Sequence, residues 1–180
     1  MKSAKTVILA VTGSIAAYKA CEIISLLKKA SVDINVVLTE EGAKFITPLT
    51  LQTLSCNKVF TDMFAIPEEW DPMHISLANK ADLILIAPAT AGIIGKLACG
   101  ICDSLLSCVV YATKAPVLIA PAMNSNMYQH VIVKENISRL KKIGYKFVDP
   151  VEGRLVCGAY GVGRLADPEK IVSEAKRLLK

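Results

Sequence analysis

Four short, largely apolar runs, each followed by a segment with helical periodicity, constrain the fold of this 180-residue chain more than any other feature. The runs span residues 5–11, 33–38, 82–87 and 117–120. Apolar runs of this length are typical of strands buried on both faces, and strands that alternate with helices favour a parallel sheet. We therefore predict an α/β fold over residues 1–180, a single doubly wound domain with three layers and a parallel sheet.

The remaining elements are predicted from helical spacing and from the positions of glycine and proline. Helices are expected over residues 15–30, 40–45, 74–80, 92–99, 104–112 and 131–143, a turn over 88–90, a short strand over 145–148, and a last helix capped by Asp167 and started by Pro168. Residues 47–73 are punctuated by prolines and are expected to be irregular. Residues 150–166 are rich in glycine and are expected to form a mobile loop.

The composition limits both the core and the partners of this chain. Hydrophobic residues make up 53% and aromatic residues only 6%, so we expect a core of Ala, Val, Ile and Leu, which suits a helix-covered sheet better than a sandwich or barrel. The formal charge of +5 is spread over separate helix faces, so no nucleic-acid partner is expected. No apolar run reaches the roughly 18 residues that span a membrane. Residues 1–5 lead straight into the first strand, so we expect no signal peptide, no membrane partner and a cytoplasmic protein.

Six cysteines raise the alternatives of a disulfide framework or a metal site. Most of them lie within apolar helical patterns, where cysteine acts as a small hydrophobic residue. Cys99 and Cys102 have the C-x-x-C spacing of a redox or zinc pair, but they follow a predicted helix, and no second pair with suitable spacing is present. A turn between two helices is therefore favoured, with Asp103 as the cap of the second helix, and no metal is expected.

The carboxyl ends of the predicted strands carry small, hydroxyl or amide residues. These ends are Gly13 and Ser14, Thr39, residues 88–92 and residues 121–124. In an open parallel sheet, ligands bind beyond such ends, where helix amino termini point their unpaired N–H groups. Gly13 permits a tight turn, and Ser14 can cap the next helix or donate to a phosphate oxygen. Neither a G-x-G-x-x-G fingerprint nor a P-loop is present, so a mononucleotide with one phosphate fits better than NAD or ATP.

Several separate motifs, in the same order along nearly the whole chain, resemble those of the homo-oligomeric flavin-containing cysteine decarboxylases. They are Gly-Ser-Ile-Ala-Ala-Tyr-Lys at residues 13–19, Met-His-Ile at 73–75, Ala-Pro-Ala-Thr-Ala at 87–91, Lys-Leu-Ala at 96–98, Pro-Ala-Met-Asn-Ser-Asn-Met at 121–127 and Leu-Val-Cys-Gly at 155–158, followed by Gly161 and Gly163. The resemblance implies a flavodoxin/Rossmann-like domain with FMN as its cofactor. It also implies a homo-oligomer built from trimers, with the flavin at subunit contacts.

The reaction implied by this resemblance converts 4'-phosphopantothenoylcysteine to 4'-phosphopantetheine in coenzyme A biosynthesis, with loss of CO2. Direct loss of CO2 from the cysteine end would leave a carbanion that no neighbouring group can delocalise. Transient oxidation of the thiol to a thioaldehyde removes this obstacle, because CO2 can then leave to give a delocalised enethiolate. The reduced flavin returns the hydride, so no external oxidant is consumed.

By resemblance, three residues carry this chemistry: His74 as acid/base in the oxidation, Asn124 as ligand of the substrate carboxylate, and Cys157 as proton donor to the enethiolate. Met127 is expected to bind the substrate as well, and the loop at residues 150–166 to close over it as a clamp. From the residues alone, each has an alternative role: His74 as a surface or capping histidine, Asn124 as the N-cap of the turn that follows it, and Cys157 as an incidental loop cysteine.

The resemblance also assigns flavin contacts. The expected contacts are Gly13, Ser14, Ile15, Thr39, Phe45, Ala89, Thr90, Ala91, Gly92 and Tyr128. Three positions depart from the usual family residues, with Gly92 in place of Asn, Tyr128 in place of Trp and Ser104 in place of an acidic residue. Tyr128 keeps a flat face for the flavin ring, whereas Gly92 removes one expected amide contact.

Other functions share parts of this sequence pattern. A peptidyl-cysteine decarboxylase of peptide antibiotic maturation would use the same His74 and Asn124, but such enzymes stop at the enethiol, so the motif around Cys157 argues against it. A non-catalytic flavin-binding regulatory or electron-transfer protein would need no proton donor. A flavin prenyltransferase is disfavoured by the run at residues 121–124. In many bacteria the decarboxylase is fused to phosphopantothenoylcysteine synthetase, so we expect either a free-standing chain or one half of such a fusion, with the synthetase as a partner.

Overall fold

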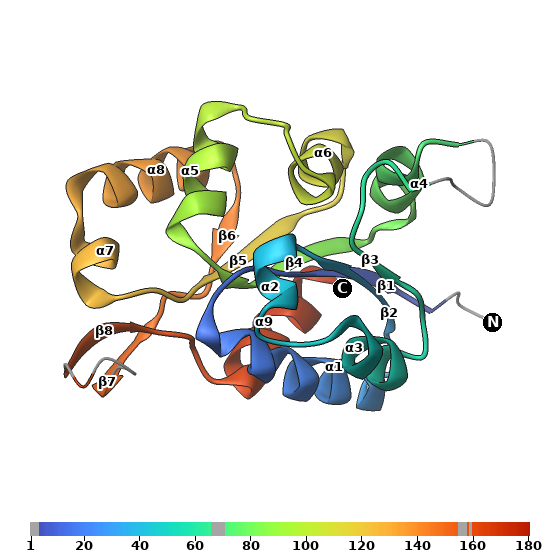
Figure 1. Cartoon of the computed structure of the whole chain (residues 1–180), viewed down its shortest axis with the longest axis horizontal. Helices are drawn as coiled ribbons and strands as arrows, with labels where there is room; N and C mark the ends of the chain where they lie inside the picture. Colours follow the sequence, from blue (N-terminus) through green and yellow to red (C-terminus); the bar gives the residue numbers. More distant parts are fainter. Residues whose placement is uncertain (1–3, 66–70, 155–157, 159) are drawn as a thin grey trace.

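A computed structural model describes residues 4–65, 71–154, 158 and 160–180 of the chain. Its centre is a parallel sheet with the strand order β3-β2-β1-β4-β5-β6 (Figure 1). The strands are β1 (Thr6–Val11), β2 (Asp33–Leu38), β3 (Val59–Phe60), β4 (Leu83–Ala89), β5 (Val117–Pro121) and β6 (Lys146–Phe147). The predicted doubly wound α/β domain is confirmed, and this strand order is the one found in Rossmann folds.

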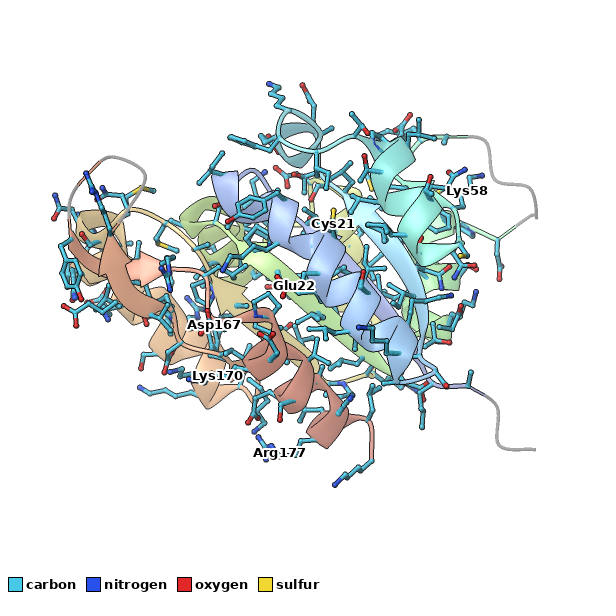
Figure 2. All side chains as sticks on the ribbon, turned by 90° about the horizontal axis from the view of Figure 1, so that it is seen from below. Cys21, Glu22, Lys58, Asp167, Lys170 and Arg177 are labelled. Atoms are coloured by element: carbon cyan, nitrogen blue, oxygen red, sulfur yellow. The ribbon has the colours of Figure 1, made fainter. Side chains whose placement is uncertain are left out.

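Helices cover both faces of the sheet (Figure 1). They are the 3₁₀ helix η1 (Ile15–Lys19) and the α-helices α1 (Ala20–Lys29), α2 (Glu40–Ala43), α3 (Pro48–Ser55), α4 (Met73–Lys80), α5 (Ala91–Cys99), α6 (Leu105–Ala112), α7 (Ser125–Gln129), α8 (Val131–Lys142) and α9 (Pro168–Leu178). Leu9 of β1 packs in a core with α1, α3 and α9, whereas Ile8 packs in a second core with α4, α5, α6 and α8. Figure 2 shows α1 and α9, marked by Cys21 and Arg177, side by side on the first face. Because successive strand side chains point to opposite faces, a strand covered on both sides must be apolar throughout.

The prediction that residues 47–73 are irregular is wrong, because this segment contains α3 and β3. Thr47 caps α3 by accepting the N–H of Thr50. Pro48 occupies the first helical turn, where its missing N–H breaks no helical hydrogen bond. The proline therefore starts a helix instead of breaking one, and β3 then pairs with β2 as a short edge strand.

Residues 150–166, predicted to be a mobile loop, contain an antiparallel hairpin of β7 (Val151–Arg154) and β8 (Tyr160–Arg164). The glycine content misled this prediction. Gly163 serves close packing, since a Cβ at this position would lie 2.2 Å from the carbonyl oxygen of Met123. The described part of the segment is therefore ordered by strand pairing and by contact with the end of β5.

Several element boundaries differ from those predicted. The helix expected over residues 15–30 is divided into η1 and α1, and the short helix α7 was not predicted. β4 continues to Ala89, which was expected in a turn, because Ala89 pairs with Pro121 of β5. The last helix starts at Pro168 as predicted, although Asp167 makes no side-chain cap hydrogen bond. Within the described ranges, no helix is long and apolar enough to cross a membrane.

The link between α5 and α6 is a turn, as predicted for the C-x-x-C segment. Gly100 ends α5 with a left-handed φ of 77°. Ser104, and not Asp103, caps α6, because the Ser104 hydroxyl accepts the N–H of Ser107 at 3.4 Å, whereas Asp103 forms an ion pair with Lys96 at 2.8 Å. The five cysteines in the described part of the chain are free. No group of three or more His, Cys, Asp or Glu side chains that could hold a metal ion occurs among the described residues.

Candidate functional site

The carboxyl ends of β1 and β4 meet at the centre of the sheet, where the strand order reverses. Thr12, which follows β1, connects these two ends. Its Oγ1 donates to the carbonyl oxygen of Pro88 at 2.7 Å and accepts the N–H of Thr90 at 3.1 Å. A buried hydroxyl that both donates and accepts fixes the spacing of the strand ends. Ligands of doubly wound sheets bind at such a reversal point.

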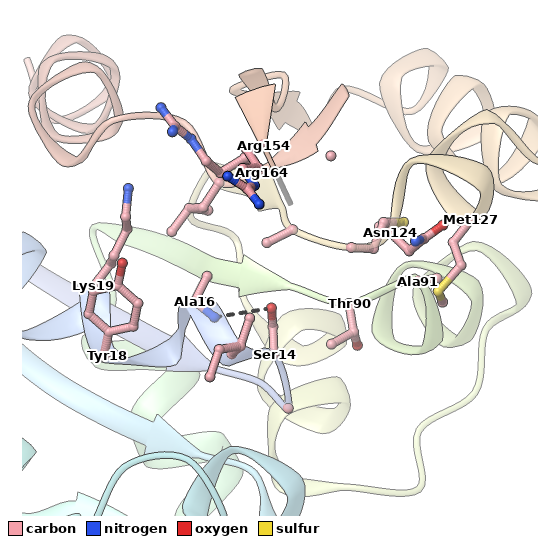
Figure 3. A pocket seen from close by; sticks show the side chains of 16 residues that line it. Ser14, Ala16, Tyr18, Lys19, Thr90, Ala91, Asn124, Met127, Arg154 and Arg164 are labelled. Carbon is pink, nitrogen blue, oxygen red and sulfur yellow. Dashed lines mark hydrogen bonds between the residues drawn. The ribbon is translucent and has the colours of Figure 1, made fainter. Parts of the chain in front are cut away.

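A cavity of about 570 Å³ opens at this point, between η1, the start of α5, the end of β5 and the β7–β8 hairpin (Figure 3). The predicted site residues in its wall are Gly13, Ser14, Ile15, Thr90, Ala91, Asn124 and Met127. These residues come from three strand ends that are far apart in the sequence. The structure therefore brings these strand ends to one cavity, and the roles predicted for these residues stay predictions.

Three helices begin at the cavity, and each is capped by a side chain in its wall. The hydroxyl oxygens of Ser14 and Thr90 accept N–H groups from the first turns of η1 and α5, each at 3.3 Å. The Oδ1 atom of Asn124 accepts the N–H of Asn126 at 2.8 Å, at the start of α7. The capping role considered for Asn124 is thus present, and the Oδ1 atom of its carboxamide serves it.

The turn after β1 is packed too closely for a side chain. A Cβ on Gly13 would lie 2.4 Å from the Cβ of Glu41, and a Cβ on Gly42 would lie 2.7 Å from the carbonyl oxygen of Val11. Thr39 caps α2, because its Oγ1 accepts the N–H of Gly42 at 3.1 Å, and its own N–H donates to the carbonyl oxygen of Val11 at 3.1 Å, which ties the start of α2 to the end of β1. Close backbone approach beside helix amino termini is the geometry that receives a phosphate group. The residues at this turn therefore fit a mononucleotide.

Besides Tyr128, four of the residues predicted to contact flavin are not in the cavity wall. Thr39 caps α2, Ala89 is buried within β4, and Gly92 lies in the first turn of α5, with the hydroxyl of Thr90 nearby. Phe45, which follows α2, is 48% exposed. The flavin contacts of these four residues stay predictions.

Tyr128, predicted to face the flavin ring, also lies outside the cavity wall. Its side chain is buried in the second core, and the Nζ of Lys134 lies 3.9 Å from the centre of its ring. Burial raises the pKa of the Tyr128 hydroxyl, and the neighbouring carboxylate of Asp149 raises it further. Lys134 thus occupies one face of the ring, and the predicted flavin contact of Tyr128 stays a prediction.

His74 is half-buried in the first turn of α4 and does not line the cavity. Figure 1 places α4 and α7, the helix capped by Asn124, at opposite ends of the molecule. One protomer therefore does not bring His74 to Asn124. Cys157, the third predicted catalytic residue, lies outside the described residues.

Three basic side chains in the cavity wall were not predicted, namely Lys19, Arg154 and Arg164. The sequence predicts that the basic residues lie on solvent-exposed helix faces. This prediction does not hold for Arg154 and Arg164, which lie on the strands of a hairpin. The available signal was the position of both arginines beside glycines in a segment without helical periodicity.

A family model described as Flavoprotein matches residues 1–180. The chain is 49% identical to the coenzyme A biosynthesis bifunctional protein CoaBC of Bacillus subtilis, over 98% of this chain and 44% of that protein. It is 43% identical to the probable phosphopantothenoylcysteine decarboxylase of Streptococcus mutans, over 97% of this chain and 99% of that protein. The chain thus spans less than half the length of the bifunctional relative.

Solved structures share the fold of this chain. A cysteine-to-serine mutant of PPC decarboxylase, complexed with pantothenoylaminoethenethiol, has a TM-score of 0.85 and 30% identity, covering 97% of this chain and 98% of that chain. The FMN-dependent cysteine decarboxylase SpaF has a TM-score of 0.84 and 25% identity, covering 99% and 98%. At this coverage the similarity concerns the whole domain and not a shared sheet alone.

Proposed function

Because the chain belongs to the flavoprotein family, we propose that it is an FMN-dependent carboxy-lyase that converts 4'-phosphopantothenoylcysteine to 4'-phosphopantetheine and CO2 in coenzyme A biosynthesis. The observation that carries this proposal is the position of Asn124. The end of β5 presents its carboxamide to a cavity that is also bounded by the turn at Gly13 and by Met127. Two curated relatives of coenzyme A biosynthesis, at 49% and 43% identity, support the choice of substrate.

Residues at the reversal point of the sheet are proposed to hold FMN. The turn at Gly13 and Ser14 would receive its phosphate, because the first N–H groups of η1 lie there. Thr90 and Ala91, at the start of α5, line the same cavity and would contact the rest of the nucleotide. Bound FMN supplies a reversible two-electron acceptor for the substrate thiol. The chain's own part is to hold the substrate and to move protons.

Asn124 is proposed to hold the substrate carboxylate through its Nδ2 donors. The hydrogen bond from the Asn126 N–H to Oδ1 fixes the carboxamide before the substrate arrives. Ile15, Met123 and Met127 line the same cavity with apolar surface. An apolar wall that excludes water favours the departure of a charged carboxylate as neutral CO2.

We further propose a homo-oligomer built from trimers, in which His74 of one protomer completes the cavity of a neighbour. The separation of α4 and α7 within one protomer supports this arrangement (Figure 1). Large apolar side chains exposed in the segments beside these helices support it too, since Phe64 is 82% exposed before α4 and Val131 is 61% exposed after α7. His74 would then accept the proton of the substrate thiol, because histidine can take up and return a proton near neutral pH.

Cys157 is proposed to give a proton to the enethiolate in the last step. The hairpin on either side of it contributes Arg154 and Gly163 to the cavity wall, which supports a position near the substrate. The cysteine-to-serine mutant of PPC decarboxylase, complexed with an aminoethenethiol, is consistent with a reaction that stops one step early when this thiol is absent.

A peptidyl-cysteine decarboxylase, the alternative function, has weaker support. The two curated relatives, at 49% and 43% identity, are named for coenzyme A biosynthesis and for phosphopantothenoylcysteine decarboxylase. We also propose phosphopantothenoylcysteine synthetase as a partner, fused or separate, because this chain matches 44% of a bifunctional relative. A cytoplasmic location stays a prediction.

Purified protein tests the proposed function. The protein should be yellow, or become yellow when FMN is added, and should release CO2 from 4'-phosphopantothenoylcysteine without an added oxidant. A synthetic peptide that ends in cysteine serves as the control substrate and should release little CO2. Protein that cannot be reconstituted with FMN, or that prefers the peptide, contradicts the proposal.

A further inference from the structure

Three basic side chains gather at the end of the cavity that lies away from Asn124. Lys19 comes from η1, Arg154 from β7 and Arg164 from β8. Figure 3 shows Lys19 and the two arginines on one side, with Asn124 and Met127 on the other. The cavity therefore has a cationic end and a carboxamide end.

None of these three cations forms an ion pair with another described residue. The ion pairs of the described chain use other basic residues, such as Lys96 with Asp103 and Lys141 with Asp149. Positive charges that share one cavity repel one another, and an anion between them reverses that repulsion. The cationic end is thus electrostatically suited to an anionic ligand group.

The hairpin also fixes the position of its two arginines. The guanidinium of Arg164 lies against Gly153, where a Cβ would be 3.4 Å from Nη1 of Arg164. Arg164 pairs with Val151 and Arg154 pairs with Tyr160, at opposite ends of the ladder, so the Arg164 side chain reaches along the hairpin to the residue next to Arg154, and Figure 3 shows the two side chains close together. β8 is tied to the end of β5 by the hydrogen bond from the N–H of Met123 to the carbonyl oxygen of Gly163, at 2.9 Å.

We propose that Lys19, Arg154 and Arg164 bind the 4'-phosphate of the substrate, an inference that rests on the proposed function. The substrate is a long molecule with a phosphate monoester at one end and a cysteine carboxylate at the other. The cavity presents cations at one end and the carboxamide of Asn124 at the other. Arginine binds phosphate oxygens through paired N–H donors, and lysine adds a compact charge. A peptide substrate has no such phosphate, so this end of the cavity selects the coenzyme A precursor.

The phosphate of FMN has the same chemistry and is the rival occupant of these cations. The turn at Gly13 and Ser14, at the start of η1, is the position proposed above for the flavin phosphate, and this leaves the cationic end for the substrate. Measurement of bound FMN separates the two sources, because only cations that hold the flavin phosphate affect flavin content.

The test compares Arg154→Gln and Arg164→Gln, singly and together, on phosphopantothenoylcysteine and on pantothenoylcysteine, which lacks the phosphate. Each single change is expected to lower kcat/KM for the phosphorylated substrate by about 10- to 100-fold, mainly through KM, because it removes charge-assisted hydrogen bonds. The value for pantothenoylcysteine and the FMN content are expected to stay nearly unchanged. Arg139→Gln is the matched control, since it removes one exposed positive charge from α8, away from the cavity, and it should affect neither substrate.

Arg154→Lys keeps the charge and is expected to recover part of the loss, which a misfolded hairpin would not do. Equal losses on both substrates would overturn the inference, because the arginines would then only position the hairpin. Loss of FMN from the variants would also overturn it, in favour of the flavin phosphate. Wild-type protein that decarboxylates neither substrate would refute the proposed function and the inference with it, before any variant is compared.

Discussion

The N–H of Met123 donates to the carbonyl oxygen of Gly163 at 2.9 Å, and this hydrogen bond joins the end of β5 to the β7–β8 hairpin. Asn124 directly follows Met123, and Arg164 directly follows Gly163. The same backbone contact therefore positions the carboxamide and one of the cavity arginines. A change that lengthens this contact should disturb both ends of the cavity together.

Replacing Gly163 with alanine tests this link. The added Cβ would lie 2.2 Å from the carbonyl oxygen of Met123, so the hairpin or the strand end must shift. We expect the free energy of unfolding, measured by urea denaturation, to fall by about 1–3 kcal/mol. Gly95→Ala in α5 is the control, because its Cβ meets only Nδ2 of Asn136 at 3.7 Å. That control should be neutral or more stable by about 0.5–1 kcal/mol, and equal losses in the two variants would contradict the account.

Asn124→Asp separates the capping role of Asn124 from its proposed role in binding carboxylate. An aspartate oxygen can still accept the N–H of Asn126, so the fold should be kept. Its negative charge would repel the substrate carboxylate, so we expect CO2 release to fall by about 100-fold or more. Asn124→Ala should lose activity too, and should also lose about 1 kcal/mol of stability with the cap. An aspartate variant with near-normal activity would show that Asn124 is only a cap.

Co-expression of two inactive variants tests whether neighbouring protomers share the site. His74→Asn and Asn124→Asp are each expected to be inactive alone. In a mixed oligomer, a site is intact when its Asn124 comes from a His74→Asn protomer and its His74 comes from an Asn124→Asp protomer. Random mixing should therefore restore about a quarter of the sites. CO2 release by the purified mixture measures the recovery. Activity that stays at the level of the single variants would place both residues in one protomer's site or exclude a shared site.

Asp82 should make stability depend on acid pH. Its hydrogen bond with the Lys5 ammonium, at 2.8 Å, and a second one from the N–H of Thr6 lower the pKa of the Asp82 carboxyl. Folding therefore favours the ionised form of Asp82. Its contribution to the free energy of unfolding is fully present above the aspartate pKa of the unfolded chain, about 3.9, and is lost as the pH falls through the lower pKa of the folded protein. The stability difference between wild type and Asp82→Asn should be largest at neutral pH and should shrink in acid. Urea denaturation across this range measures it, with exposed Glu135→Gln as control; a difference independent of pH would refute the assignment.

The sheet could be predicted from the sequence because its strands are buried on both faces, which makes their apolar runs visible without any knowledge of tertiary contacts. Pro48 and Gly163 misled the prediction for a common reason. Proline and glycine often mark irregular chain, but Pro48 lies in a first helical turn and Gly163 lies under a neighbouring carbonyl group. Only tertiary structure distinguishes these uses from a loop.

The candidate site was predictable to the extent that it depends on strand ends. Parallel strands bring their carboxyl ends to one edge, so the meeting of Ser14, Thr90 and Asn124 followed from the order of elements. The distance of His74 from Asn124 could not be predicted, because it depends on how helices lie around the sheet. The cationic end of the cavity could not be predicted either, because Lys19 and Arg154 come together only through the contact of the hairpin with β5.

The mass of the product, measured together with CO2 release, tests the central claim most directly. Wild-type protein loaded with FMN should convert 4'-phosphopantothenoylcysteine to 4'-phosphopantetheine, one molecule for each CO2, with no added oxidant or reductant. Cys157→Ser should still release CO2 but should give a product two hydrogens lighter, the enethiol, because the last proton donor is missing. Wild-type protein that releases no CO2, or a serine variant that makes phosphopantetheine at the normal rate, would contradict this account.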